Sequence, residues 1–378
     1  MMKKANKLLI LLVLTSFLTG CWDYKDINMR AIALSIGVDL ADKNIEFSGE
    51  VAKILSLSDI QQEKTHLSNV YNVLSYGKTF EEARLDYDAK NPLQTFLGAA
   101  RVVIFGENFA KEGIESYLHR IDSLYDYRKT LLPVISRDRP KDLFEKKIVK
   151  DISVGFLIED ILTQLEEDGE ALYPYISELL SDISFGKIGY LIPYIGIENN
   201  SIKYLGLAVM KNSKMIDVIK IENTFGILYL LSENLTLVEP FPSINDKNNT
   251  LSFRTKIKKR KIKTDYKNEQ ILINIDLSLF AELKYQYSMQ PVSNEDIKKY
   301  EKVISKKVSD NINSIIEKAQ KEFQCDIFRF AKEFRGNHPK IYKKINWEDE
   351  FPNAEININV ETKIRNTTLS DTNARKKY

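Results

Sequence analysis

Two long segments that alternate apolar and polar residues, followed by a long amphipathic segment, place the strongest constraint on the fold of this chain. Residues 251–264 and 270–283 alternate in the manner of β-strands and are joined by a polar turn. Ser293 and Asp296 resemble a helix capping box, with Asp in place of the usual Glu. Apolar residues then recur at three- and four-residue steps as far as Phe323. We expect this stripe to pack on the hairpin's own sheet; docking on a partner is the alternative.

The preceding residues mix predicted strands with predicted helices. Predicted strands cover residues 31–39, 45–54, 68–76, 101–105, 131–135, 190–197 and 204–209, and predicted helices cover 79–89, 109–124, 154–167, 171–183 and 222–231. Residues 206–219 read as a hairpin, and residues 239–249, rich in turn formers, read as a linker or domain edge. After the long helix, residues 326–334 predict a second helix and 356–364 a final strand.

The predicted fold class is α+β, with several domains of mixed sheets packed with helices. We expect a lipoprotein signal peptide at 1–20, an N-terminal α+β domain at 21–185 and a small middle domain at 186–248. A C-terminal α+β domain at 249–378 would carry the long amphipathic helix on its sheet.

The N-terminus predicts an export signal. Three lysines (Lys3, Lys4, Lys7) precede an apolar run from Leu8 to Leu18, which is too short to span a ~30 Å hydrocarbon core. The residues Leu18-Thr19-Gly20-Cys21 resemble the lipobox of bacterial lipoproteins, so Cys21 is the predicted site of lipid attachment. The alternative is a buried cysteine that falls near a signal peptide by chance.

Lipidation of Cys21 would hold the body to the outer face of a cytoplasmic membrane, with each buried CH₂ contributing about 0.8 kcal/mol. No later segment approaches 18 uninterrupted apolar residues, so the sequence predicts no second anchor.

Composition excludes several classes of function. The 55 Lys plus Arg nearly balance 53 Asp plus Glu, so the body lacks the charge excess of a nucleic-acid-binding protein. Two cysteines and three histidines are too few for a disulfide framework or a Cys-rich metal cluster. The chain contains no nucleophile elbow, phosphate-binding glycine loop or His-Glu metal helix. We therefore expect no enzyme activity, no cofactor and no metal site.

A basic run lies on the first of the two long predicted strands. Seven cations occur within ten residues: Arg254, Lys256, Lys258, Lys259, Arg260, Lys261 and Lys263. One interpretation is a patch that touches anionic lipid headgroups or a partner's acidic loop, represented by Arg254, Lys256, Lys258, Arg260 and Lys261. The other is an exposed sheet face whose lysines discourage edge pairing.

Several segments together resemble the Ger(x)C lipoproteins, the C subunits of spore nutrient germinant receptors. The matching segments are Cys21-Trp22-Asp23 with Ile27, AIALSIGVD, GLAVMKNSKMIDVI, and the block from Cys325, DIFRFAKEFRGNHPKIYKKINWEDEFPNAEININVETKIR. Tyr24 and Lys25 stand where the family often carries basic residues, and residues 365–368 replace a more basic, Gly-ending finish.

The resemblance implies a three-domain α+β body in the inner membrane of a dormant spore, in a complex with an A subunit and a transporter-like B subunit. The function expected is assembly and coupling in nutrient-triggered germination. A solute-binding lipoprotein of an importer is the first alternative, and it would need two similar α/β lobes around a cleft. A surface hydrolase is the second.

Overall fold

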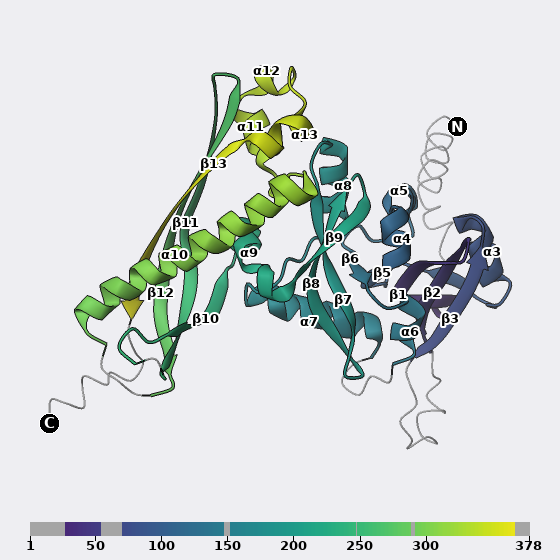
Figure 1. Cartoon of the computed structure of the whole chain (residues 1–378). Coiled ribbons are helices and arrows are strands. Elements are labelled where there is room, and N and C mark those ends of the chain that lie inside the picture. The colour runs from purple at the N-terminus through teal and green to yellow at the C-terminus, as the bar shows by residue number, and fades with distance from the viewer. Residues whose placement is uncertain (1–26, 54–69, 147–151, 247, 289–291, 367–378) are drawn as a thin grey trace, which may run out of the picture.

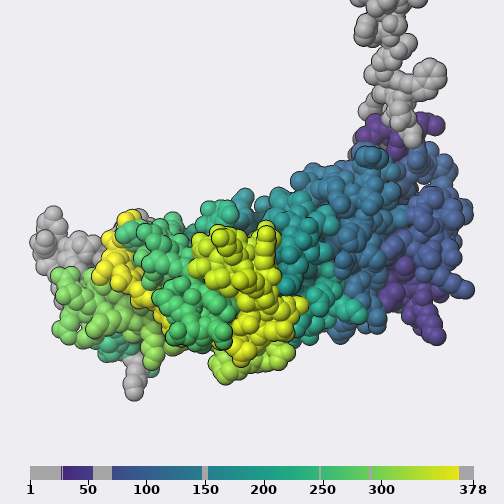
Figure 2. Space-filling view, turned by 90° about the horizontal axis from the view of Figure 1, so that it is seen from above, coloured from purple at the N-terminus to yellow at the C-terminus, as the bar shows by residue number. Residues whose placement is uncertain are grey.

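The protein, a computed structural model, is described over residues 27–53, 70–146, 152–246, 248–288 and 292–366. It forms an elongated body in which the N-terminal residues occupy one end and the last third of the chain the other (Figures 1 and 2). Two sheets organise these ends, which confirms the expected α+β class with mixed sheets.

Among the described residues, the first sheet has nine strands in the order β3-β2-β1-β5-β6-β7-β8-β9, with β4 paired to β1. Its middle strands β1, β5, β6 and β7 run parallel, and the outer pairs are antiparallel. The strands are β1 (Arg30–Ala41), β2 (Asn44–Ala52), β3 (Val70–Gly77), β4 (Gln94–Phe96), β5 (Val102–Gly106), β6 (Leu132–Ser136), β7 (Tyr190–Glu198), β8 (Ser201–Lys211) and β9 (Lys214–Lys220).

Helices cover both faces of this sheet, because the central strands are apolar on both sides. Val103 and Phe105 of β5 pack with α4 (Glu107–Glu112), α5 (Glu115–Ser123) and α8 (Ile176–Phe185). Val102 and Ile104, on the other face, pack with α6 (Pro140–Phe144) and α7 (Val154–Glu167). Helix α3 (Phe80–Asp88) follows the edge strand β3.

The second sheet has the order β10-β11-β12-β13, and one long helix crosses one of its faces (Figure 1). Its elements are β10 (Thr236–Pro242), β11 (Thr250–Lys267), β12 (Gln270–Gln286), α10 (Asn294–Lys318) and β13 (Glu355–Asn366). The apolar residues of α10 and alternate residues of β12 share one core, which confirms the predicted helix on a sheet. Ser293 and Asp296 form the predicted capping box.

Short elements connect these layers. They are η1 (Ile27–Met29), η2 (Ile221–Asn223), α9 (Phe225–Leu231), η3 (Ala319–Phe323), α11 (Phe330–Asn337), α12 (Pro339–Tyr342), α13 (Trp347–Glu350) and η4 (Phe351–Asn353). The core of the second sheet also includes residues of β7, β8 and β9, so apolar packing continues from one sheet to the other. Within the described residues, no helix is long and apolar enough to cross a membrane.

Two sequence predictions were wrong in detail. The expected linker at 239–249 begins inside β10, because Glu239 occupies a buried strand position and Pro240 an exposed one on an edge strand. The expected helix at 109–124 is two helices, since Gly113 has a φ of 131°, a backbone conformation that ends α4.

The segment 186–248, expected as a small middle domain, contributes β7, β8 and β9 to the first sheet and β10 to the second. The expected domain boundaries at 185 and 248 stay a prediction.

Candidate functional site

The predicted lipid anchor cannot be placed in the fold. Cys21 and the signal peptide at 1–20 lie outside the described residues, which begin at Ile27. Lipidation of Cys21 therefore stays a prediction.

The basic run of β11 separates into two groups with different surroundings. Arg254, Lys256 and Lys261 lie opposite Glu282, Phe280 and Asp276 of β12, which alternate with the buried residues of that strand. Within the described residues, neither these three cations nor Lys258 forms an ion pair with a carboxylate. Four members of the predicted patch thus lie together on the sheet face opposite α10.

A β-bulge between Ile257 and Lys259 inverts the alternation of β11 and sends Arg260 to the opposite face. Arg260 pairs with Leu277 of β12, a core residue. Its Nη1 donates hydrogen bonds to the carbonyl oxygens of Tyr229, at 3.2 Å, and Ser232, at 2.8 Å. These carbonyls lie at the C-terminal end of helix α9, where they have no partner within the helix. Arg260 therefore hydrogen-bonds the end of this helix and is not part of the patch.

Phe280 gives the patch an aromatic centre. The Nζ of Lys258 lies 5.2 Å from the Phe280 ring centroid, and the guanidinium of Arg365, from β13, stacks on the same ring. Cations over an aromatic face are attracted by its electron density. The cations of this sheet face therefore come from two strands, β11 and β13, and the ring between them comes from β12.

A buried acid joins the first sheet's helices to the last third of the chain. Asp182 of α8 is 1% exposed and accepts hydrogen bonds from Arg329 Nε, at 3.1 Å, and Arg329 Nη2, at 2.9 Å. Lys332 of α11 pairs with the other carboxylate oxygen. Phe185, at the end of the same helix, lies under Arg335, whose Cζ is 4.3 Å from its ring centroid. The two parts are thus joined by charge as well as by apolar packing.

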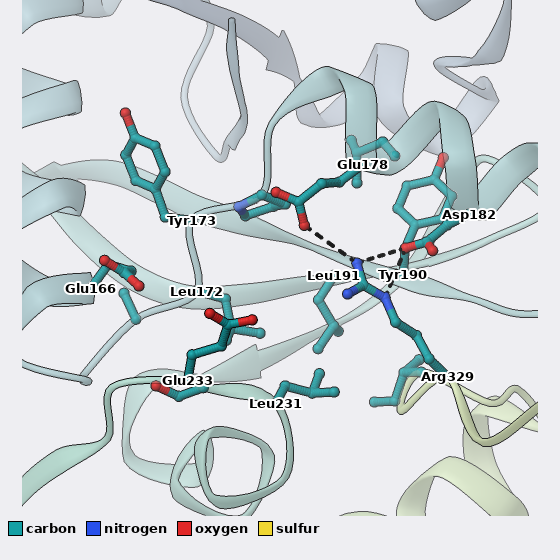
Figure 3. A pocket seen from close by; sticks show the side chains of 15 residues that line it. Glu166, Leu172, Tyr173, Glu178, Asp182, Tyr190, Leu191, Leu231, Glu233 and Arg329 are labelled. Carbon is teal, nitrogen blue, oxygen red and sulfur yellow. Dashed lines mark hydrogen bonds and ion pairs between the residues drawn. The ribbon is translucent and has the colours of Figure 1, made fainter. Parts of the chain in front are cut away.

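Beside this junction lies a cavity of about 250 Å³ (Figure 3). Its walls come from α7, α8, β7, the segment after α9 and the loop before α11. Four acids (Glu166, Glu178, Asp182 and Glu233) line it with one cation, Arg329. In Figure 3 the guanidinium of Arg329 points toward Asp182 and Glu178, and the Glu178 carboxylate lies 3.7 Å from Nη2. Because its cation is already bonded to Asp182, we read this cavity as part of the junction.

Two observations on the described residues concern catalysis. These residues contain no group of three or more His, Cys, Asp or Glu arranged to hold a metal ion. Cys325 is buried and unpaired with another cysteine, and burial raises the pKa of its thiol to about 12, which disfavours the nucleophilic thiolate.

Sequence reasoning missed two buried acids, Asp182 of the junction and Asp326, whose carboxylate bonds the backbone at the start of α11. Both are about 1% exposed. The sequence did indicate that Asp182 is buried. This residue lies six positions after Ile176 and three after Leu179, on the apolar side of its helix. Nothing in the local pattern indicates that its partners come from residues about 150 positions later.

Comparisons with known proteins agree with this architecture. A family described as "Spore germination protein N-terminal domain" matches residues 23–197, and one described as "Spore germination B3/ GerAC like, C-terminal" matches residues 205–368. Spore germination protein B3 of Bacillus subtilis (strain 168) is 24% identical over 377 residues, covering 97% of this chain and 98% of that protein. Spore germination protein A3 of the same organism is 26% identical over 382 residues, covering 95% and 97%.

A solved structure shares the fold. The crystal structure of the GerBC protein matches with a TM-score of 0.54 and 16% identity, covering 87% of this chain and 96% of that chain. The two family matches extend from residue 23 to residue 368 and include both sheets. The chain therefore belongs to the Ger(x)C family of spore germination proteins.

Proposed function

We propose that this chain is the lipid-anchored subunit of a spore nutrient germinant receptor, located in the spore inner membrane on the outer face of the bilayer. It would act without catalysis, by assembling with the A and B membrane subunits and coupling nutrient binding to germination. The observation that carries the proposal is the match of both halves of the chain to spore germination families, together with the LTGC lipobox.

The continuity of the body supports a role in assembly. One apolar core spans strands β7 to β9 and the whole second sheet, and Asp182 ties α8 to α11. A force or displacement applied at one end would therefore reach the other through packed side chains. Tethering by acyl chains would raise the local concentration of this body near its partners, so that modest interfaces suffice.

The tether is tested by Cys21→Ala, with Cys325→Ala as the matched control, because the chain has two cysteines. We expect Cys21→Ala to release the protein from spore membranes and to reduce nutrient-triggered germination at least tenfold, while Cys325→Ala keeps both. Membrane fractionation, mass spectrometry of the N-terminus and germination assays give the readouts. An unacylated N-terminus in the wild-type protein, or a normal nutrient response without the lipid, would contradict the proposal.

The outward cations of β11 are the proposed contact with an anionic lipid surface or an acidic loop of a receptor subunit. Each cation near a charged surface contributes about 1 kcal/mol. Lys256→Glu/Lys261→Glu should lower the amount of A and B subunits that co-purify with the protein. Lys340→Glu/Lys343→Glu makes the same charge change elsewhere and should leave assembly unchanged. If A and B are recovered equally with both double variants, the outward cations of β11 have no role in assembly.

The solute-binding alternative has less support. It requires two similar lobes around a cleft, whereas the two sheets here have nine and four strands with different connections.

A further inference from the structure

A second cavity, of about 330 Å³, lies in the N-terminal half of the protein and shares no lining residue with the cavity at the junction. It is bounded by α3 and α5 and by strands β1 and β2, at the purple and blue end of Figure 1. Small-molecule sites occupy about 300–1,000 Å³, so this volume suits a small ligand.

The walls of the cavity are mainly apolar. Ile36 of β1 and Phe47 and Val51 of β2 line it from the sheet, and Tyr117 of α5 lines it from the helix layer. The Phe47 and Tyr117 rings meet edge to face, with centroids 5.8 Å apart, and the Tyr117 hydroxyl bonds that of Tyr127 at 3.0 Å. A flat or branched apolar group would find contact on several sides of this space.

Three polar groups that line the same cavity have hydrogen-bonding capacity to spare. The Nε of Arg120 is buried and has no hydrogen-bond partner among the described residues. The hydroxyls of Tyr87 and Thr95 are buried beside one another, and each hydroxyl can make more than one hydrogen bond. Buried polar groups are nearly always satisfied in proteins, so these groups favour a ligand that offers hydrogen-bond acceptors in the cavity.

Five charged residues line the cavity, the acids Glu81, Asp88 and Asp126 and the cations Arg84 and Arg120, and the most buried of them is Arg120. Its side chain is 13% exposed and pairs with Glu81 of α3, whose side chain is 59% exposed. Glu81 also pairs with Arg84, at 2.8 Å, so one carboxylate is shared between two guanidinium groups. Glu81 bonds Nη1 of Arg120 and Tyr127 is a second hydrogen-bond partner of this side chain, whereas its buried Nε–H has no partner among the described residues.

We propose that this cavity binds a small carboxylate with an aromatic or branched aliphatic body. The apolar body contacts Ile36, Phe47 and Tyr117, and one carboxylate oxygen accepts a hydrogen bond from Arg120 Nε. The second oxygen reaches the hydroxyls of Tyr87 and Thr95. Since α3, α5 and the sheet all contribute, a bound ligand braces the two helices against each other.

The probe for this site is phenylacetate, with phenylacetamide as its neutral analogue. Binding is measured on the full chain in detergent, by saturation-transfer NMR and by the shift in unfolding temperature. We expect saturable binding of phenylacetate and at least tenfold weaker binding of phenylacetamide, because charge-assisted hydrogen bonds exceed neutral ones.

Three variants locate the binding. Arg120→Gln should weaken phenylacetate binding at least tenfold, and Tyr87→Phe, which keeps the ring, should weaken it several-fold. Arg128→Gln is the matched control, because Arg128 bonds Thr130 and does not line the cavity. If Arg120→Gln does not fold, Tyr87→Phe decides the question.

The proposal is overturned if phenylacetate shows no saturable binding at millimolar concentration, which would mean that the cavity holds only water. It is also overturned if Tyr87→Phe and Arg120→Gln bind as the wild type does. The measurement uses neither the lipid anchor nor the receptor subunits, so a negative result here leaves the proposed receptor function standing.

Discussion

At the scale of the residue, Asp326 shows how a buried acid can organise a chain segment. Its carboxylate oxygens accept hydrogen bonds from the backbone N–H groups of Phe328, Phe330 and Ala331, and from Trp347 Nε1 at 3.1 Å. These bonds favour the ionised form, but burial outweighs them and raises the pKa of Asp326 to about 6. The acid therefore holds the first turn of α11 and the fully buried Trp347 in place.

The raised pKa predicts a pH-dependent stability. Between about pH 4 and pH 6 the folded protein keeps the Asp326 proton while the unfolded chain has lost it, so stability from this group falls as pH rises. The test compares the free energies of unfolding of the wild type and of Asp326→Asn. The wild-type value minus the variant value should fall by up to about 3 kcal/mol from pH 4 to pH 7. Urea unfolding at several pH values measures it.

A matched control for this pH effect is Asp310→Asn, on the exposed side of α10. The change with pH should be larger for Asp326→Asn than for this variant. An Asp326→Asn difference that does not fall with pH, or that changes no more than the control does, would contradict the assignment.

At the scale of the element, β11 shows how one extra residue changes which side chains meet. The bulge next to Ile257 leaves Lys256 and Lys261 on the open face but turns Arg260 toward α9. Among the described residues, β11 has no β10 partner beyond Lys256, and His338 bonds the strand there through a ring nitrogen 3.0 Å from Thr264 O. Side chains thus protect an edge that would otherwise expose backbone groups.

This arrangement predicts unequal effects on stability for neighbouring cations. Arg260→Gln should lower the free energy of unfolding by about 1–3 kcal/mol, because two carbonyls at the end of α9 lose a charged donor in a half-buried site. Lys261→Gln, one residue away on the exposed face, should change it by less than about 0.5 kcal/mol. Urea unfolding midpoints provide the comparison, and equal losses for the two variants would show that Arg260 has no special role.

At the scale of the whole molecule, three apolar cores are joined in series. Two lie on opposite faces of the first sheet, and the third runs from β7, β8 and β9 into the second sheet. The junction adds Asp182 with its two cations, and Lys211 Nζ donates to the carbonyl of Gln324 at 3.0 Å. Because polar and apolar contacts coincide there, the two ends should unfold together.

Removing the junction acid tests this coupling. Asp182→Ala leaves Arg329 and Lys332 without their buried partner and should cost about 2 kcal/mol, below the 3–5 kcal/mol of a fully buried pair because both cations are partly exposed. In Asp182→Ala, we expect the amide hydrogens of α8 and α11 to exchange faster than in the wild type, and those of α7 to be affected less. Glu178→Gln is the control, since Glu178 approaches Arg329 at the surface, and should cost less than about 1 kcal/mol.

The sequence by itself determined the local structure of this protein. Alternation over β11 and β12, the stripe from Ile304 to Ile316 and the Ser293 cap are encoded by neighbours within a few residues, and the structure contains all three. One failure occurred where a polar side chain occupies a buried position: strand β10 was not predicted because Glu239 lies in it, and the partners of Glu239, Tyr229 and Lys307, are on other elements.

The tertiary structure alone decided where the side chains of the candidate sites lie. The bulge that removes Arg260 from the basic face, the meeting of Asp182 with Arg329, and the convergence of Arg120, Tyr87 and Thr95 on one cavity all depend on strand register and helix packing. These contacts join residues far apart in the chain, whose approach is set by burial of apolar surface across the whole fold and leaves no periodic trace in the sequence.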